Sequence, residues 1–176
     1  MDPCTQGLLG ASLSCALAKR DKLKVAATLG AIGGMAPDLD IFIRSVNDQL
    51  LFIEYHRHFT HSLIFIPFGA LIITILLYPF MKIKNSFKSV YYYLFLGFST
   101  HGLLDACTSY GTSLLWPFSD YRVARNIISI IDPIFTLTLL FFIIFSLLKK
   151  KKALCTKHML LRCSMHMWLR CSWHQT

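Results

Sequence analysis

The sequence predicts an all-α protein, a polytopic membrane helix bundle of about four spans plus a short N-terminal helix. Two observations predict this fold class. The chain is 55% hydrophobic and only 15% charged, whereas soluble domains are about 45–50% apolar and about 25% charged. The apolar residues are also gathered in blocks, close to the roughly 20 residues that cross a hydrocarbon core of about 30 Å. A length of 176 residues fits one domain.

Two apolar blocks are long enough to span a bilayer without interruption. Residues 62–81 contain no charged side chain, and residues 127–148 contain only Asp132. Residues 3–18 are weakly apolar and short, which predicts a half-span or a surface helix.

Two further blocks, residues 25–43 and 90–110, are apolar but interrupted. The interrupting residues are Pro37, Asp38, Asp40, His101 and Asp105. A charged side chain at the centre of a span costs about 2.5–3.5 kcal/mol on insertion scales, so such residues usually face a partner, a cavity or a metal. The interruptions are therefore candidate functional residues.

The lysines indicate how the spans are oriented. All eleven lie in residues 19–24, 82–88 and 149–157. The positive-inside rule places such clusters in the cytoplasm. Four spans then return the chain to the cytoplasmic side at each of the three clusters. Because span flanks explain the net charge of +9, we predict no direct nucleic-acid binding.

With this topology, the polar candidates all fall at the membrane face opposite the lysines. Three groups carry them: the end of the first span, the start of the second, and the outer parts of the third and fourth. The residues concerned are Asp38, Asp40, His56, His58, His61, His101, Asp105 and Asp132.

His101 and Asp105 are spaced i, i+4, which places both on one face of a helix. They could share one metal ion, or Asp105 could only hold the His101 ring by a hydrogen bond. A metal-bound histidine often has such a carboxylate behind it, so the two interpretations overlap.

Residues 56–62, which contain three histidines, could form either a ligand site or an exposed loop. Thr60 is the predicted N-cap of the second span, with His61 at its first position, and His56 and His61 are favoured over His58 as ligands. Pro37 is expected to break the first span, which leaves Asp38 and Asp40 either in irregular backbone lining a cavity or as turn residues.

Asp132 also has a simpler interpretation. An Asp at the N-cap followed by Pro133 at the first helical position is a common helix start.

Taken in order, these motifs resemble one family, the LexA-binding, inner-membrane-associated hydrolases, also described as YdjM-like membrane-bound metal-dependent hydrolases. The resemblance covers residues 1–148. The motifs that carry it are Met1-Asp2-Pro3, Thr5, Gly10, Pro37-Asp38-Leu39-Asp40, His56-Arg57, Thr60-His61-Ser62, His101, Leu104-Asp105, Tyr110-Gly111, Leu115, Pro117-Phe118-Ser119 and Asp132-Pro133.

The resemblance implies a site, a cofactor and a location. The implied metal ligands are Asp38, Asp40, His56, His61, His101 and Asp105, with Asp38, His61 and Asp105 as catalytic residues. The implied cofactor is a divalent metal ion, zinc first and manganese or magnesium as alternatives. The implied location is a multi-pass protein of the bacterial inner (cytoplasmic) membrane. Gln6 stands where the family commonly has a histidine.

The predicted domains are a membrane-embedded hydrolase domain over residues 1–148 and a disordered basic tail over residues 149–176. The tail holds an eight-residue Cys/His repeat from residue 155. This repeat is either a soft-metal segment or the translation of a short DNA repeat.

Three functions fit the sequence. The first is metal-dependent hydrolysis at the membrane surface. The expected partner is membrane lipid, and the substrate would be a lipid or a phosphoester. The second is a non-enzymatic membrane metal-binding or transport protein. The third is an inactive, truncated member of the family, to which Gln6 points. Contact with LexA is implied by the family name alone.

Overall fold

The computed structural model describes residues 2–42, 59–81, 86–109, 111–119, 121–129 and 131–149. Within them the protein is all-helical, which confirms the predicted class. The α-helices are α1 (Pro3–Leu17), α2 (Leu23–Met35), α4 (Phe65–Met81), α5 (Phe87–Ala106) and α6 (Pro133–Lys149). Short 3₁₀ helices η1 (Arg20–Lys22), η2 (Ala36–Phe42) and η3 (Phe59–His61) complete the described elements.

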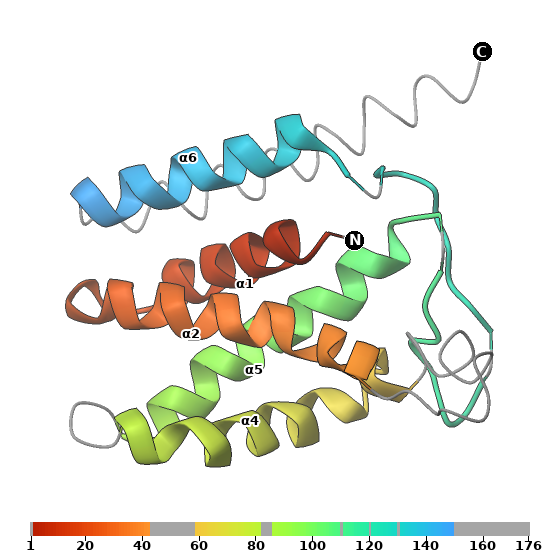
Figure 1. Cartoon of the computed structure of the whole chain (residues 1–176), viewed down its shortest axis with the longest axis horizontal. Coiled ribbons are helices and arrows are strands. Elements are labelled where there is room, and N and C mark those ends of the chain that lie inside the picture. Colours follow the sequence, from red (N-terminus) through yellow and green to blue (C-terminus); the bar gives the residue numbers. More distant parts are fainter. Residues whose placement is uncertain are drawn as a thin grey trace.

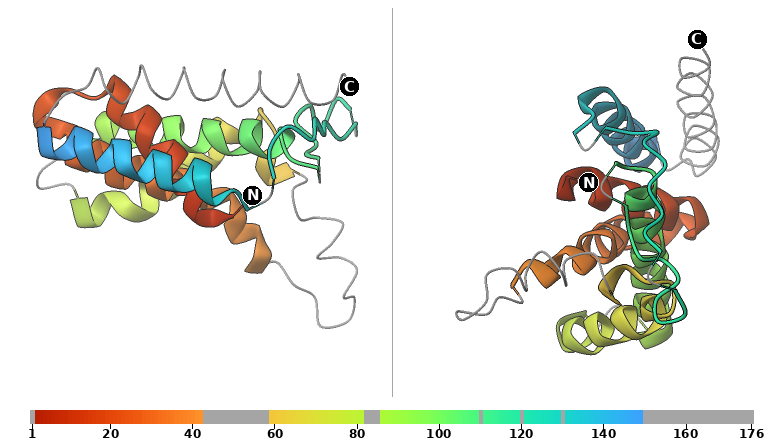
Figure 2. Two further views of the ribbon diagram at one scale, coloured as in Figure 1. Left: turned by 90° about the horizontal axis from the view of Figure 1, so that it is seen from above. Right: turned by 90° about the vertical axis from the view of Figure 1, so that its right-hand side faces the viewer.

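The helices form a layered bundle around α1, α2 and α5 (Figure 1). Helix α1 lies between α6 and α2, and α5 packs against both α1 and α2. Helix α4 packs against α5 on the other side of the bundle from α6. Figure 2 shows that the helices run broadly along one direction, so the bundle has two distinct ends.

Two helices begin with an aspartate cap and a proline, an arrangement that the sequence predicts at Asp132. Asp2 accepts a hydrogen bond from the Thr5 amide at 2.9 Å and precedes Pro3. Asp132 accepts one from the Phe135 amide at 3.1 Å, at the start of α6. These caps satisfy amide groups that a helix start leaves without partners. The capping interpretation of Asp132 is therefore confirmed.

The predicted break near Pro37 is confirmed, because α2 ends at Met35 and continues as η2. The predicted N-cap role of Thr60 is wrong. Thr60 lies inside η3, and α4 begins at Phe65. The Phe65 amide instead donates to the Ser62 hydroxyl at 3.3 Å, so Thr60 is available for another contact.

Helix α1 is not a surface helix. Nine of its residues are buried, and it contacts α2, α5 and α6. Close backbone approach explains this burial. A Cβ atom on Gly34 would lie under 3.0 Å from the Gln6 carbonyl oxygen, and one on Gly97 equally close to the Gly30 carbonyl oxygen. These glycines thus allow the helices to pack closely.

Four membrane spans are not confirmed. In the part of the chain that the structure describes, no helix is at once long enough and apolar enough to cross a bilayer. The repeat tail and His56 and His58 lie outside the described residues.

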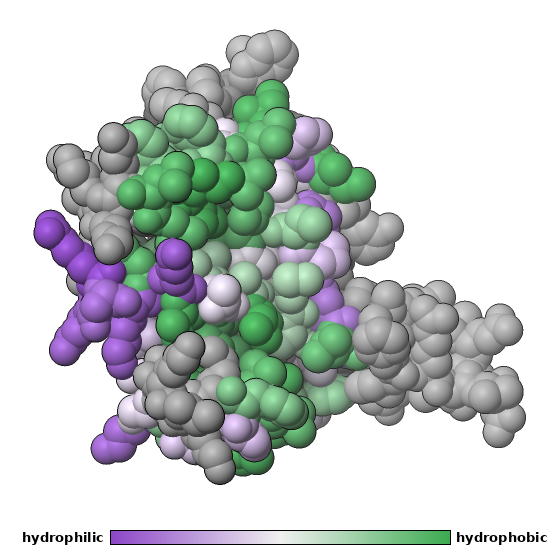
Figure 3. All heavy atoms as spheres, turned by 60° about the vertical axis from the view of Figure 1, so that its left-hand side comes forward, coloured by the Kyte–Doolittle hydropathy of each residue, from purple (hydrophilic) through white to green (hydrophobic). Residues whose placement is uncertain are grey.

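The ends of the bundle differ in chemistry. The α1–α2 connection, the start of α5 and the end of α6 lie at one end (Figure 1), and these are the parts of the chain that adjoin the lysine clusters. Helix α2 ends and α4 begins at the opposite end. Hydrophobic residues cover much of the face seen in Figure 3, and hydrophilic residues protrude at one side of it.

Candidate metal centre

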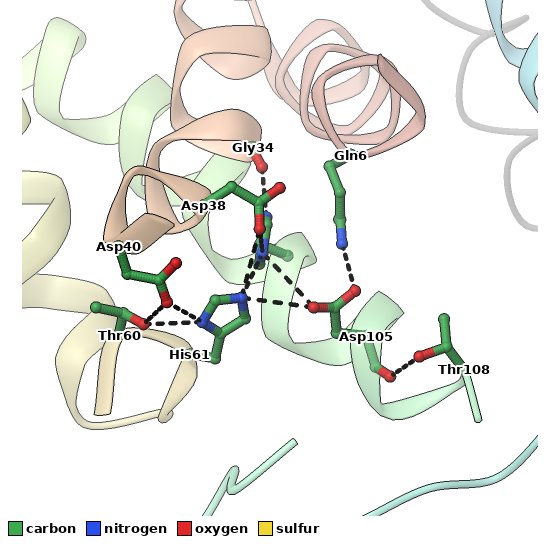
Figure 4. Close-up of polar contacts among 9 residues, drawn as sticks. Gln6, Gly34, Asp38, Asp40, Thr60, His61, Asp105 and Thr108 are labelled. Atoms are coloured by element: carbon green, nitrogen blue, oxygen red, sulfur yellow. Dashed lines mark hydrogen bonds and ion pairs between the residues drawn. The ribbon is translucent and has the colours of Figure 1, made fainter. Parts of the chain in front are cut away.

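Four of the predicted site residues meet where α2 ends and α4 begins, at the end of the bundle opposite the α1–α2 connection (Figure 1). Figure 4 shows three of them, Asp38, His61 and Asp105, pointing toward one another. Asp38 comes from η2, His61 from η3, and His101 and Asp105 from α5. The i, i+4 pair on α5 does share one face, with His101 Nε2 at 3.8 Å from Asp105 Oδ2. The histidines and Asp105 are fully or almost fully buried, and the Asp38 side chain is partly exposed.

The four side chains converge on a small volume. The Nε2 atoms of His61 and His101 lie 2.8 Å apart. Asp38 Oδ1 is 3.3 Å from His101 Nε2 and 3.7 Å from His61 Nε2. Asp105 Oδ2 is 3.4 Å from His61 Nε2. Two imidazole nitrogens and two carboxylate oxygens therefore face one point.

The other nitrogen of each ring is held by the protein. His101 Nδ1 lies 2.6 Å from the Gly34 carbonyl oxygen, which can only accept, so Nδ1 carries the proton. Thr60 donates its hydroxyl proton to Asp40 Oδ2 at 2.8 Å. The Thr60 oxygen, 2.9 Å from His61 Nδ1, is then the acceptor for an Nδ1 proton.

This hydrogen-bond network assigns the same tautomer to both rings. With Nδ1 protonated, each neutral ring has a lone pair on Nε2, and the two lone pairs face each other. Only a proton or a cation between them relieves this repulsion. An Nδ1 proton bound to a carbonyl or hydroxyl oxygen is also the usual arrangement behind a metal-bound histidine.

The direction of the pKa shift of His61 agrees with this repulsion between lone pairs. Burial lowers the pKa of His61, but its hydrogen bonds to Asp105 and Asp38 and its attraction to Asp105 and Asp40 outweigh burial. The pKa therefore lies above the ordinary value of 6.5. The carboxylates around the ring thus favour its protonated form when no cation is bound.

The residues present fit a divalent cation. One ligand atom from each of Asp38, His61 and His101 lies within 4.8 Å of the others, and Asp105 Oδ2 adds a fourth donor beside them. Asp38 Oδ2 is buried and has no hydrogen-bond partner among the described residues. Nitrogen and carboxylate donors in this number are typical of zinc sites, and manganese accepts the same donors.

The structure places Asp40 differently from the other predicted ligands. Its Oδ2 atom lies 3.6 Å from His61 Nδ1, on the opposite side of the ring from Nε2. Together with Thr60, it orients His61 from behind. Sequence reasoning missed this role for Thr60. The prediction for His56 lies outside the described residues.

Gln6 is the second residue whose role the sequence did not reveal. Its side chain is fully buried on α1, and Nε2 donates to Asp105 Oδ1 at 2.8 Å. This bond fixes one carboxylate oxygen, so that the other points towards His61. The motif that identified Gln6 as a departure from the family was the only signal, and it did not predict the partner.

Comparisons with known proteins agree with these motifs. The sequence matches a family model described as YdjM inner membrane protein over residues 1–174, further than the predicted resemblance over residues 1–148. It is also 34% identical over 101 residues to the uncharacterized protein YfhP of Bacillus subtilis (strain 168). That match covers 57% of this chain and 30% of the relative. No solved structure matches the chain.

Proposed function

The chain belongs to the YdjM inner membrane protein family, and we propose that it is a metal-dependent hydrolase of the inner membrane. The observation that carries this proposal is the pair of histidine Nε2 atoms, 2.8 Å apart, each with its Nδ1 atom bonded from behind. Two buried rings held with their lone pairs together favour a cation site over a merely structural pair.

The proposed ligands are Asp38, His61, His101 and Asp105. These residues would hold a divalent ion, which would supply Lewis-acid chemistry towards a substrate oxygen and lower the pKa of bound water towards about 7. Thr60 and Asp40 hold the His61 ring in place, and Gln6 holds Asp105. Asp38 is the ligand that reaches the surface, and its second oxygen is the proposed acceptor for a proton from attacking water.

We further propose that the protein is multi-pass. Support comes from the outward faces of α4 and α6, which expose large apolar side chains. These include Phe68, Ile75, Leu76, Phe80, Leu137, Phe141 and Leu148. Contiguous apolar surface of this kind usually marks an interaction site or a membrane contact.

The lysine-flanked end of the bundle is proposed to face the cytoplasm, with the metal centre at the other face. A reporter that is active only in the periplasm, fused after Lys88, tests this orientation. The fusion should be inactive, and activity there would reverse the proposed topology.

The proposed substrate is a lipid or a lipid-linked phosphoester, because a membrane protein meets such molecules at its surface. An alternative is a membrane protein that binds metal without catalysis. The described residues contain a single cluster of three or more His, Cys, Asp or Glu side chains with metal-site spacing. One site at one end favours a hydrolase over an ion pathway, which needs polar groups across the membrane.

Metal content of the detergent-purified protein tests the proposal. Mass spectrometry should find about one divalent ion per chain in the wild type and a loss of that ion in His61→Ala and His101→Ala. Asp132→Ala is the matched control, since Asp132 caps α6 and should keep the ion.

A folded wild-type protein that holds no metal after reconstitution would refute the proposal. If metal is bound, a hydrolysis screen with lipid phosphoesters separates the enzyme from the metal-binding alternative.

A further inference from the structure

A groove of about 230 Å³ lies beside the metal centre, between η2, η3, α4 and α5. Nearly all of its lining is apolar, including Ala36, Phe65, Ile73 and Phe98. Only Asp40 and Thr60 are polar. We propose that this groove binds an acyl chain of a membrane lipid, whose head group reaches the metal centre. The proposal rests on the proposed function.

The polar end of the groove borders the metal centre. Asp40 and Thr60 line the groove and also contact His61 Nδ1, while His61 Nε2 faces the other ligands. One imidazole ring therefore separates the groove from the metal position. Consecutive residues of η2 divide the two environments, because Asp38 faces the histidines and Leu39 lines the groove.

The shape of the groove suits one hydrocarbon chain. Its floor is buried at Ala36 and Phe98, while Leu39 and Ile72 are exposed at its rim. Sites that enclose a whole drug-sized ligand have volumes of about 300–1,000 Å³. A groove below that range, with an open rim and an apolar floor, can hold part of a chain but not a complete lipid.

The rim is continuous with the apolar face of α4. Ile72 lines the groove, and the same helix exposes Phe68, Ile75 and Leu76. In an inner membrane protein this face meets lipid chains, so a chain can enter from the side without crossing water. Because the lining is almost entirely apolar, the groove would leave the polar groups of another occupant without hydrogen-bond partners, which favours an acyl chain.

The experiment uses the full-length protein in phosphatidylethanolamine–phosphatidylglycerol vesicles. A phospholipid with a photoactivatable diazirine on its acyl chain is cross-linked, and the labelled residues are found by peptide mass spectrometry. Surface lipid labels exposed residues such as Phe68. Phe98, 3% exposed, is reached only by a chain inside the groove. Leu94, one turn away on α5 and 0% exposed, is the buried control.

Two variants make the test specific. Ile72→Trp narrows the rim and should reduce labelling of Phe98 to the level of Leu94. Ile75→Trp is the matched control, because Ile75 is similarly exposed on α4 but does not line the groove. It should leave the labelling unchanged.

The outcomes separate this proposal from the proposed function. Three results would each overturn the groove proposal. They are an unlabelled Phe98 when Phe68 is labelled, equal labelling of Phe98 and Leu94, and unchanged labelling of Phe98 in Ile72→Trp. A second copy of the chain covering the groove would give the first of these results. Specific labelling of Phe98 in a protein without metal would support the groove and refute the hydrolase.

Discussion

Replacing Gln6 with leucine is expected to weaken metal binding while leaving the fold intact. The side chain is fully buried and gives one hydrogen bond to Asp105 Oδ1. Hydrogen bonds to charged groups contribute about 1.5–3 kcal/mol, and each 1.4 kcal/mol corresponds to roughly tenfold in a dissociation constant. Leucine has a similar size and no donor, so Asp105 loses the contact that fixes its orientation.

The structure also sets the expected size of the effect. Gln6 Oε1 is buried without a hydrogen-bond partner among the described residues, and leucine removes that unfavourable group. Part of the loss is therefore offset, and the expected weakening is about tenfold, the lower end of the roughly 10–100-fold range for residues behind metal ligands. Titration of the metal-free protein against a chelator of known affinity measures it.

Ser14→Ala is the matched control for Gln6→Leu. The Ser14 hydroxyl also connects α1 to α5, by donating to the Tyr93 carbonyl oxygen at 3.1 Å, but away from the metal centre. Its loss should lower thermal stability by about 1 kcal/mol and leave the dissociation constant unchanged. An unchanged metal affinity in folded Gln6→Leu would refute the positioning role, as would an equal loss in Ser14→Ala.

Three further changes follow from the same contacts. Thr60→Val removes the hydroxyl between Asp40 and His61 and should weaken metal binding about tenfold. Thr60→Ser keeps a hydroxyl and should bind metal like the wild type in the same titration. An unchanged metal affinity in Thr60→Val, or an equal loss of affinity in Thr60→Ser, would contradict the role of Thr60. Gly34→Ala brings a methyl group against the Gln6 carbonyl oxygen and should destabilise the fold by about 1–3 kcal/mol, measured by thermal unfolding. Gly7→Ala, which meets the flexible Met35 side chain at 3.1 Å and the Ala31 carbonyl oxygen only at 3.4 Å, should be nearly neutral. Because the pKa of His61 is raised above 6.5, protons should compete with the metal from a higher pH than for an ordinary histidine, so the measured affinity falls as pH falls through that pKa. The stability of the metal-free protein depends on pH in the opposite direction. The stabilisation by charged His61 is present below pH 6.5 and is lost as pH rises through the raised pKa. A melting temperature independent of pH would contradict this expectation.

The sequence by itself determined the helical class and several helix boundaries. Local interactions set these features, so they can be read from neighbouring residues. Pro37 ends α2, and the Asp2-Pro3 and Asp132-Pro133 pairs begin α1 and α6. The spacing of His101 and Asp105 likewise determined that they share one helical face.

Some predictions from the sequence concerned the surroundings of the protein rather than its local structure. The length of the apolar blocks and the positions of the lysines predicted four spans, whereas no described helix meets the requirement for crossing a bilayer. Helix α1 is weakly apolar in sequence, but it is buried because glycines allow α2 to approach it closely. Apolar content alone cannot distinguish contact with lipid from contact with another helix.

Only the tertiary structure decided which polar groups act together. Gln6 and Asp105 are 99 residues apart, and Gly34 and His101 are 67 residues apart. Asp40 was predicted beside Asp38 as a ligand, yet it lies behind His61 with Thr60. The two carboxylates are two residues apart on the 3₁₀ helix η2, and its three residues per turn point their side chains in different directions. The sequence did not show that this segment is a 3₁₀ helix. The residue types are thus set by the sequence, and the packing of η2, η3 and α5 decides which of them form the candidate metal site, which support it and which line the groove.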